Sequence, residues 1–310
     1  MNRKLLIVAQ WIYFPLVFFL GWRMFGESSA DIFQIIDQIK LPVLLYAALV
    51  VLVGLTVTGI IWAILFGFQG YFRPPRLLQP AFYIGQLAKY IPGSVWVFGV
   101  QAHLIRKLQI PGRATVTTGM VFVYVNVISA SVLGLVVVPS LWPQLGSKGI
   151  LLVVIGITGL LLLGPLPVKH FILLLSSSES TVDVRYRKQI KVVVGIFVVW
   201  ILYGFSIKIL SDSISSGSSI TLLYATSAFA VAYALGVLAI FSPAGIGVRE
   251  GVLIYALTPE LGLEASISIA LITRLIHTSS DFLLATVWYL CDKTRSNHFQ
   301  KNLFDRNRNS

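Results

Sequence analysis

The sequence predicts an all-α integral membrane protein with about eight transmembrane helices, and three observations support this fold class. The chain of 310 residues is 56% hydrophobic and only 12% charged, whereas a soluble domain carries about 25% charged residues. Apolar runs close to the roughly 20 residues that cross a bilayer recur along the chain. Two of these runs are interrupted, which predicts discontinuous or re-entrant helices at Pro92 and Gly93 and between Pro243 and Gly247. We expect one polytopic domain over residues 1–292 and a basic, disordered tail over 293–310.

The net charge and the cysteine and histidine content exclude several functional classes. The net charge of +12 is typical of a membrane protein whose cytoplasmic loops are rich in Lys and Arg, and no basic run interleaved with aromatic residues indicates a nucleic-acid surface. The single cysteine, Cys291, cannot form an intrachain disulfide or a cysteine metal cluster. We expect no metal, no cofactor and no nucleic-acid partner, because the histidines are too scattered for a metal site, at His103, His170, His277 and His298.

The predicted crossings follow one another with short polar connections. Arg3 and Lys4 precede the first apolar run as in a signal peptide, but no small-x-small cleavage site follows, so we expect an uncleaved helix. A small acidic turn is predicted over residues 259–264. The eight predicted crossings are residues 5–22, 41–68, 114–138, 150–168, 192–210, 220–241, 245–257 and 265–290.

The first irregular segment covers residues 80–107. Pro92 and Gly93 divide it into two helical halves, and each half is too short to cross a bilayer. We expect a re-entrant hairpin that enters and leaves on one side of the membrane. A single kinked span is the alternative. Lys89 and Trp96 flank this break and are candidate ligand-binding residues, although Lys89 could instead extend to the lipid headgroups with its apolar stem in the lipid.

The second irregular segment lies between two apolar runs and contains Pro243, Gly245 and Gly247 next to Arg249 and Glu250. Irregular backbone at membrane depth persists only where it is buried in protein or lines a wet cavity, and ionisable residues there mark functional sites. The alternative is a tight loop at the membrane surface with both charges solvated. Because adjacent helical residues point about 100° apart, we expect Glu250 to pair with a cation other than Arg249, either Arg274 or Lys89.

The two irregular segments show the same succession of features along the chain. Each breaks a helix with proline and glycine, restarts it, and lies about 150 residues from the other. Corresponding breaks in two halves of a chain indicate the binding site of a transporter, so we predict that the two breaks meet near mid-membrane. Chance use of proline and glycine is the alternative to a true repeat.

Three ionisable residues lie on one face of the last predicted crossing. Arg274, His277 and Asp281 are spaced by three and four residues, which places them on the same side of a helix. Such a face must point into the bundle. Asp281 could pair with Arg274 through a neighbour or accept a hydrogen bond from His277, and a structural ion pair or a helix end near the surface remains the alternative.

Taken together, these residues suit the binding of an anion. Lys89, Arg249 and Arg274 supply positive charge, and the helix N-termini after the two breaks present free amide donors. A lipid phosphate is the obvious anion at this depth. No nucleophile with a neighbouring base is evident, so we assign no catalytic residue, although Glu250 or Asp281 could act as a base.

The distribution of basic residues predicts the orientation. With a cytoplasmic N-terminus, four basic residues lie outside, namely Arg23, Lys40, Lys148 and Lys208, and three lie at membrane depth, namely Lys89, Arg249 and Arg274. The other 17 of the 24 are cytoplasmic, as expected if both termini are inside.

The motifs from Lys89 to Trp96, Lys-Tyr-Ile-Pro-Gly-Ser-Val-Trp, and from Pro243 to Glu250, Pro-Ala-Gly-Ile-Gly-Val-Arg-Glu, resemble the lysylphosphatidylglycerol synthase transmembrane region family. The resemblance covers about residues 41–290 and implies a lipid-handling protein of the inner membrane, a flippase in some members. Lysyl-transferring members of the family carry a large soluble domain, and we expect no such domain here, because about 20 residues follow the last predicted crossing.

These observations predict a protein that binds and flips an anionic phospholipid or lipid-linked precursor. Two other classes remain open, a membrane-embedded transferase acting on a lipid or polyprenyl phosphate and a membrane anchor for a separate soluble enzyme. Membrane lipids are the expected partners, with a homodimer or a soluble enzyme partner as further alternatives.

Overall fold

The computed structural model describes residues 32–91, 96–137, 149–175, 182–214, 219–240 and 242–308. The predicted first crossing, residues 5–22, and the break at Pro92 and Gly93 lie outside these ranges. In the described ranges every regular element is a helix. The elements are α2 (Leu41–Phe66), η1 (Gly67–Gln69), α3 (Pro75–Leu87), η2 (Ala88–Tyr90), α4 (Trp96–Ile105), η3 (Arg106–Leu108), α5 (Gly112–Gly134), α8 (Gly149–Leu162), α9 (Pro165–Leu175), α10 (Tyr186–Ile214), α11 (Leu222–Leu238), η4 (Pro243–Gly245), α12 (Val248–Leu261) and α13 (Leu263–Arg308).

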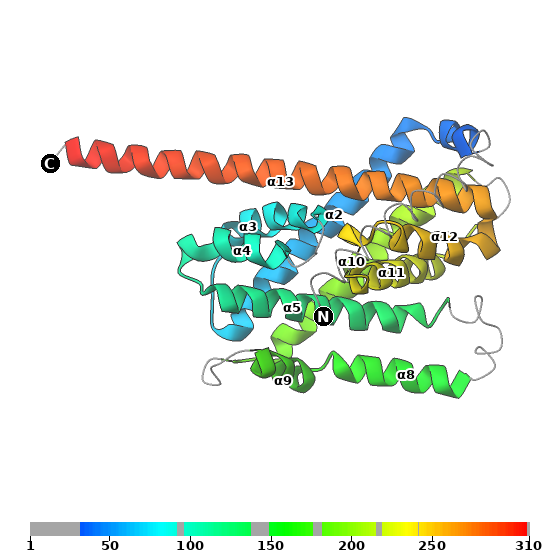
Figure 1. Ribbon diagram of the computed structural model, residues 1–310, viewed down its shortest axis with the longest axis horizontal. Helices are drawn as coiled ribbons and strands as arrows, with labels where there is room; N and C mark the ends of the chain where they lie inside the picture. Colours follow the sequence, from blue (N-terminus) through cyan, green and yellow to red (C-terminus); the bar gives the residue numbers. More distant parts are fainter. Residues whose placement is uncertain are drawn as a thin grey trace, which may run out of the picture.

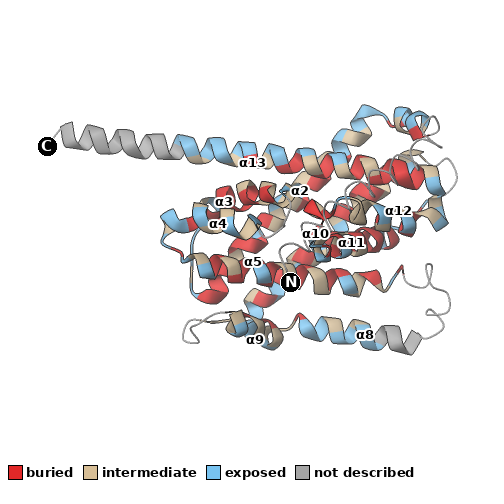
Figure 2. Ribbon diagram, in the orientation of Figure 1, coloured by how far each residue is buried: buried red, intermediate tan, exposed pale blue. Residues whose placement is uncertain are grey.

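The helices form one bundle around α10 and α11 (Figure 1). α10 packs against α2 and α11, and α11 packs in turn against α5 and α12. α13 runs along one side of the bundle in contact with α2, α3 and α12, and α8 lies outermost beside α5. Buried residues concentrate where these helices face one another, whereas α8 is largely exposed (Figure 2). The apolar side chains exposed on the outer surface of the bundle are therefore the ones that would face lipid in a membrane.

Several helices are long and apolar enough to cross a membrane. In the part of the chain that the structure describes, four helices meet this criterion singly, at Leu41–Gln69, Gly112–Gly134, Tyr186–Ile214 and Leu263–Thr294. The bent pair α8–α9 gives a fifth if it is one span. α11 is apolar but has only 17 residues. The prediction of an all-α, multi-pass membrane protein is confirmed at this level.

The predicted crossing over residues 150–168 is not one straight helix. α8 ends at Leu162, α9 begins at Pro165, and the two are bent by 57°. Proline lacks a backbone N–H and its ring disfavours a helical conformation in the preceding residue, so the helix breaks at Gly164. The amide of Gln189 donates a hydrogen bond of 2.8 Å to the carbonyl of Leu163, which satisfies a backbone acceptor that the bend leaves free.

Small residues allow the central helices to approach closely. A Cβ atom added to Gly54 in α2 would lie 2.6 Å from the ring of Tyr203 in α10, and one added to Gly204 would lie 2.4 Å from the Cα of Thr226 in α11. Small residues at helix interfaces are the usual basis of packing in membranes, where lipid provides no hydrophobic drive for association. The three helices therefore form a tightly packed unit against which the site is built.

Two predicted boundaries near the C-terminus differ from the structure. α12 continues through Pro259 to Leu261, and the chain turns at Gly262, whose φ of 81° suits a residue that ends a helix. α13 continues to Arg308, whereas a disordered tail was predicted from residue 293. Extending an existing helix requires no new nucleation, which is the physical reason that a polar segment can prolong a transmembrane helix.

Candidate functional site

The charged residues predicted to bind a ligand come together where α13 meets η2, η4 and the start of α12. Lys89 at the end of η2 forms an ion pair with Asp281 of α13, with 2.6 Å between Nζ and Oδ2. The hydroxyl of Tyr90 donates to the same oxygen at 2.8 Å. Asp281 is only 4% exposed, so this carboxylate is buried and satisfied by two residues from one short helical turn.

A second ion pair joins α13 to α12. Nη1 of Arg274 lies 3.3 Å from Oε1 of Glu250 and donates a 3.0 Å hydrogen bond to the carbonyl of Ala244. The other carboxylate oxygen, Oε2, accepts a 2.6 Å hydrogen bond from the backbone N–H of Gly247. Oε1 has no hydrogen-bond geometry to the guanidinium, so the pair interacts as two close charges. Glu250 pairs with Arg274 and not with its neighbour Arg249, as the sequence predicted.

The backbone of the second break is folded back against α11. Ala244, Gly245 and Gly247 all have positive φ, at 50°, 72° and 83°, a region that glycine adopts readily and other residues rarely. A Cβ atom on Gly245 would lie 2.9 Å from the Cα of Gly236 in α11. The two glycines therefore allow backbone-to-backbone contact, and this contact positions the start of α12, including Arg249, at the centre of the bundle.

Arg249 is the one cation of the three without a carboxylate partner among the described residues. Its guanidinium carbon lies 4.6 Å from the ring centre of Phe229 and 5.4 Å from that of Tyr233, both on α11. Nη2 is buried and has no hydrogen-bond partner. Contact with ring faces offsets part of the cost of removing a guanidinium from water, but it leaves N–H donors free for a ligand.

His277 is enclosed by aromatic rings. Its ring centre lies 5.1 Å from that of Phe229, in a stacked arrangement, and 4.8 Å from that of Tyr203, edge to face. Nε2 is buried without a hydrogen-bond partner. His277 and Asp281 form no hydrogen bond with each other in the structure, since Asp281 is engaged by Lys89 and Tyr90.

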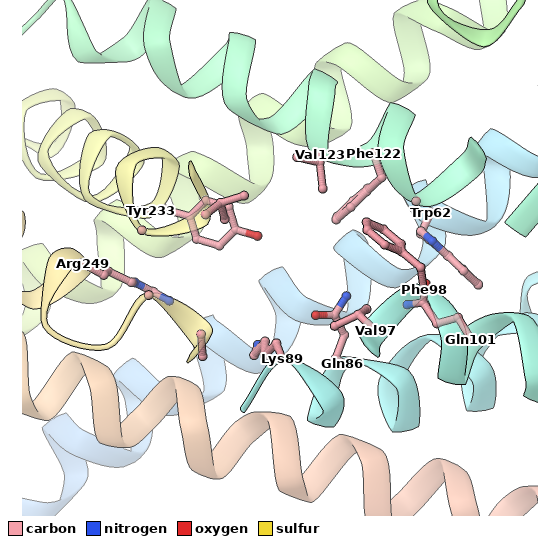
Figure 3. Close-up of a pocket in the computed structure, with 15 residues that line it drawn as sticks. Trp62, Gln86, Lys89, Val97, Phe98, Gln101, Phe122, Val123, Tyr233 and Arg249 are labelled. Carbon is pink, nitrogen blue, oxygen red and sulfur yellow. The ribbon is translucent and has the colours of Figure 1, made fainter. Parts of the chain in front are cut away.

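Two neighbouring cavities lie at this cluster. The outer cavity, of about 140 Å³, is bordered by the cations Lys89 and Arg249 and by aromatic side chains of α2, α4, α5 and α11. The inner cavity, of about 50 Å³, reaches Arg274, His277 and Asp281. Five residues border both cavities, namely Gln86, Lys89, Phe122, Tyr233 and Arg249. In Figure 3, Arg249 and Tyr233 approach the outer cavity from one side, and Trp62, Phe98 and Phe122 approach it from the other.

The structure brings together six of the seven predicted ligand-binding residues, all of which border one or both cavities or pair with a residue that does: Lys89, Arg249, Glu250, Arg274, His277 and Asp281. Trp96 does not join them. It lies at the start of α4, 55% exposed, and borders neither cavity. Trp96 was predicted at the site because it is close to the break in sequence. The direction of α4 instead leaves its side chain exposed.

The meeting of the two breaks near mid-membrane stays a prediction, but the helical turn that precedes the first break lies beside the second break. η2, which ends at Tyr90, is in contact with η4, and the guanidinium of Arg274 lies 5.9 Å from the ring centre of Tyr90 while bonding to Ala244. Pro92 and Gly93 themselves lie outside the described residues. The ends of two segments about 150 residues apart in sequence therefore lie together at the cavities.

Sequence reasoning missed the aromatic and amide residues of the site. Tyr90 directly follows Lys89 and could have been identified from the sequence as a site residue. A hydroxyl next to a cation can donate to the same carboxylate that pairs with the cation, as Tyr90 does to Asp281. Phe229 and Tyr233 are four residues apart on α11 and therefore lie on one helix face, but nothing in the sequence shows that this face meets Arg249. No group of three or more His, Cys, Asp or Glu side chains suited to a metal ion occurs among the described residues.

Comparison with models of known protein families and with curated protein sequences finds no match for this chain. The geometry of the site is therefore the basis for the functional argument.

Proposed function

We propose that this protein binds an anionic phospholipid or lipid-linked precursor at the cavities beside Arg249 and translocates it across the membrane. The observation that carries the proposal is the charge of the site. Lys89 and Arg274 each have a carboxylate partner, whereas Arg249 has none among the described residues. A buried charge without a counter-ion is costly, so a protein that retains one at a cavity is suited to receive an anion there.

The hydrogen-bonding capacity of the site supports the same conclusion. Arg249 offers a buried, unpartnered Nη2, and a guanidinium binds phosphate oxygens through paired N–H donors. Arg249 also lies in the first turn of α12, where the helix dipole favours a bound negative charge. These features act on one point, at the border shared by the two cavities.

The outer cavity is amphipathic in a way that matches a lipid. Lys89 and Arg249 border one part of it, and Trp62, Phe98 and Phe122 border another (Figure 3). A ligand with a phosphate next to an apolar part could place each end against its matching wall. A small inorganic anion would use only the charged part.

We also propose how the chain crosses the membrane. We propose eight crossings in the inner membrane, with a re-entrant hairpin at the first break and a discontinuous helix at the second. The division of basic residues, 17 cytoplasmic and four outside, supports cytoplasmic termini. The contact between η2 and η4 fits this arrangement, because transporters place such breaks together at the binding site.

The test is a lipid-translocation assay in reconstituted vesicles. Fluorescent anionic phospholipid is followed by quenching from the outer leaflet, with protein-free vesicles as background. We expect the wild-type protein to accelerate translocation and Arg249→Met to reduce lipid binding about 10- to 100-fold, which corresponds to one charged hydrogen bond of about 1.5–3 kcal/mol.

Arg113→Met is the matched control, because Arg113 is exposed and donates only a long 3.4 Å bond to the carbonyl of Leu175. It should leave both binding and translocation unchanged. A wild-type protein that binds no anionic lipid would overturn the proposal, and one that binds lipid without moving it would overturn the transport step.

A further inference from the structure

The ion pairs of the site set its total charge. Lys89, Arg249 and Arg274 contribute three positive charges, and Glu250 and Asp281 contribute two negative charges. With His277 uncharged, the cluster carries one net positive charge, and Arg249 is the one of these three cations that forms no ion pair with a described residue. A ligand with one negative charge would neutralise the cluster.

The two carboxylates are held in place by groups other than their cations. Oε2 of Glu250 accepts the backbone N–H of Gly247 at 2.6 Å, and Oδ2 of Asp281 accepts the hydroxyl of Tyr90 at 2.8 Å. A ligand that attracted Lys89 or Arg274 would therefore leave its carboxylate behind at the site. The carboxylates would then face the ligand as fixed like charges, and their repulsion in a low-dielectric interior is strong.

We infer that Glu250 and Asp281 are specificity-determining residues that restrict the site to ligands with a single negative charge. Phosphodiesters meet this requirement, whereas phosphomonoesters and diphosphates carry about two charges or more at neutral to basic pH. The inference rests on the proposed function, since it names the chemical class of anion that the same site accepts. The two residues act by repulsion against the wrong ligand, which is how specificity is commonly built.

The experiment measures competition for binding by two lipids that have the same acyl chains but differ in headgroup, a glycerol phosphodiester in one and a phosphomonoester of higher charge in the other. Wild-type protein in detergent micelles at pH 8 binds fluorescent phosphatidylglycerol, and unlabelled phosphatidylglycerol or phosphatidic acid with identical acyl chains competes. The first lipid is a phosphodiester with one charge, and the second is a monoester that carries about two at this pH. We expect phosphatidylglycerol to compete about tenfold more strongly, a difference of about 1.4 kcal/mol.

Two isosteric variants change the charge of the site without changing its shape. Glu250→Gln and Asp281→Asn each raise the net charge of the cluster from one to two, and each should reverse the order so that phosphatidic acid competes more strongly. Asp212→Asn is the matched control. Asp212 forms an exposed ion pair with Lys208, with 2.9 Å between Nζ and Oδ2, within the C-terminal turns of α10, so its loss should leave the wild-type order intact.

The outcomes separate this inference from the proposed function. Equal or stronger competition by phosphatidic acid in the wild-type protein would overturn the inference and leave anionic-lipid binding standing. The wild-type comparison decides this even if a variant fails to fold. Binding of neither lipid would overturn both.

A final competition experiment uses glycerophosphoglycerol, a water-soluble phosphodiester that has the headgroup of phosphatidylglycerol but no acyl chains. Competition at concentrations comparable to those of the lipid would assign recognition to the free headgroup, and lack of competition would assign it to the lipid. Either result supports charge selection if the order of the two lipids holds, and a reversed order refutes it.

Discussion

Replacing Glu250 by alanine should destabilise the protein more than any change to an exposed ion pair. The carboxylate has two roles in the structure. It faces Arg274 at 3.3 Å, where both side chains are 17% exposed, and it accepts the N–H of Gly247 at the start of α12. The substitution leaves a buried guanidinium without its counter-ion and a backbone donor without its acceptor. Removing one partner of a buried pair costs about 3–5 kcal/mol.

The magnitude is checked by the free energy of unfolding in mixed detergent micelles. Asp212→Ala is the matched control, because its pair with Lys208 is spaced i, i+4 and its carboxylate is 44% exposed. Exposed pairs of this spacing contribute about 0.3–0.5 kcal/mol. The expected ratio between the two losses is therefore about ten.

A double substitution tests the cause. If the loss arises from the stranded guanidinium, Glu250→Ala combined with Arg274→Met should be more stable than the sum of the two single losses predicts, since the second change removes the uncompensated charge. Equal and small losses in Glu250→Ala and Asp212→Ala would refute the reasoning and would mean that the start of α12 is a solvated turn.

Three further predictions concern the glycine turn before α12, the Lys89 ion pair and the topology. Gly245→Ala should destabilise by more than about 1–2 kcal/mol, because the residue has a φ of 72° and an added Cβ would lie 2.9 Å from Gly236. Gly251→Ala, where an added Cβ meets nothing within 4 Å, should be neutral or stabilising, and a similar loss in both by unfolding in detergent would contradict the packing argument. Lys89→Met should cost about 3–5 kcal/mol by stranding Asp281, whereas Lys89→Met with Asp281→Asn should recover part of it. Equal stability of the single and double variants in the same assay would count against a buried pair. Reporter fusions after Asp212 and at Ser310 should lie on opposite sides of the membrane, and a C-terminus outside would overturn the proposed topology.

Some features of this protein could be read from the sequence because they depend on local spacing. An apolar composition with 12% charge requires burial in lipid, so the class of fold follows from solvation alone. The spacing of Arg274, His277 and Asp281 places them on one face of a helix whatever the neighbours are, and all three do border the inner cavity. Irregular backbone was likewise indicated by Pro243, Gly245 and Gly247, and the structure shows that both glycines have the positive φ that glycine adopts readily.

Other features depended on which helix meets which, and the sequence does not specify this. Local spacing shows that Asp281 faces inward, but its partners Lys89 and Tyr90 are about 190 residues away. Trp96 was expected at the site because it follows a break, but the direction of α4 leaves it 55% exposed. The crossing predicted over residues 150–168 is bent at Gly164 and Pro165, and the Gln189 amide on α10 satisfies the freed Leu163 carbonyl, which the sequence did not indicate.

The charge of the site likewise has a part that the sequence determines and a part that depends on the tertiary structure. The five ionisable residues were all identified from the sequence, and their sum of one positive charge was available there. Only the tertiary structure decides that Glu250 belongs to Arg274 and Asp281 to Lys89, which leaves Arg249 against the rings of Phe229 and Tyr233. Charge is a property of composition, but pairing depends on distances of a few ångströms between helices, and those distances are set by packing of the whole bundle.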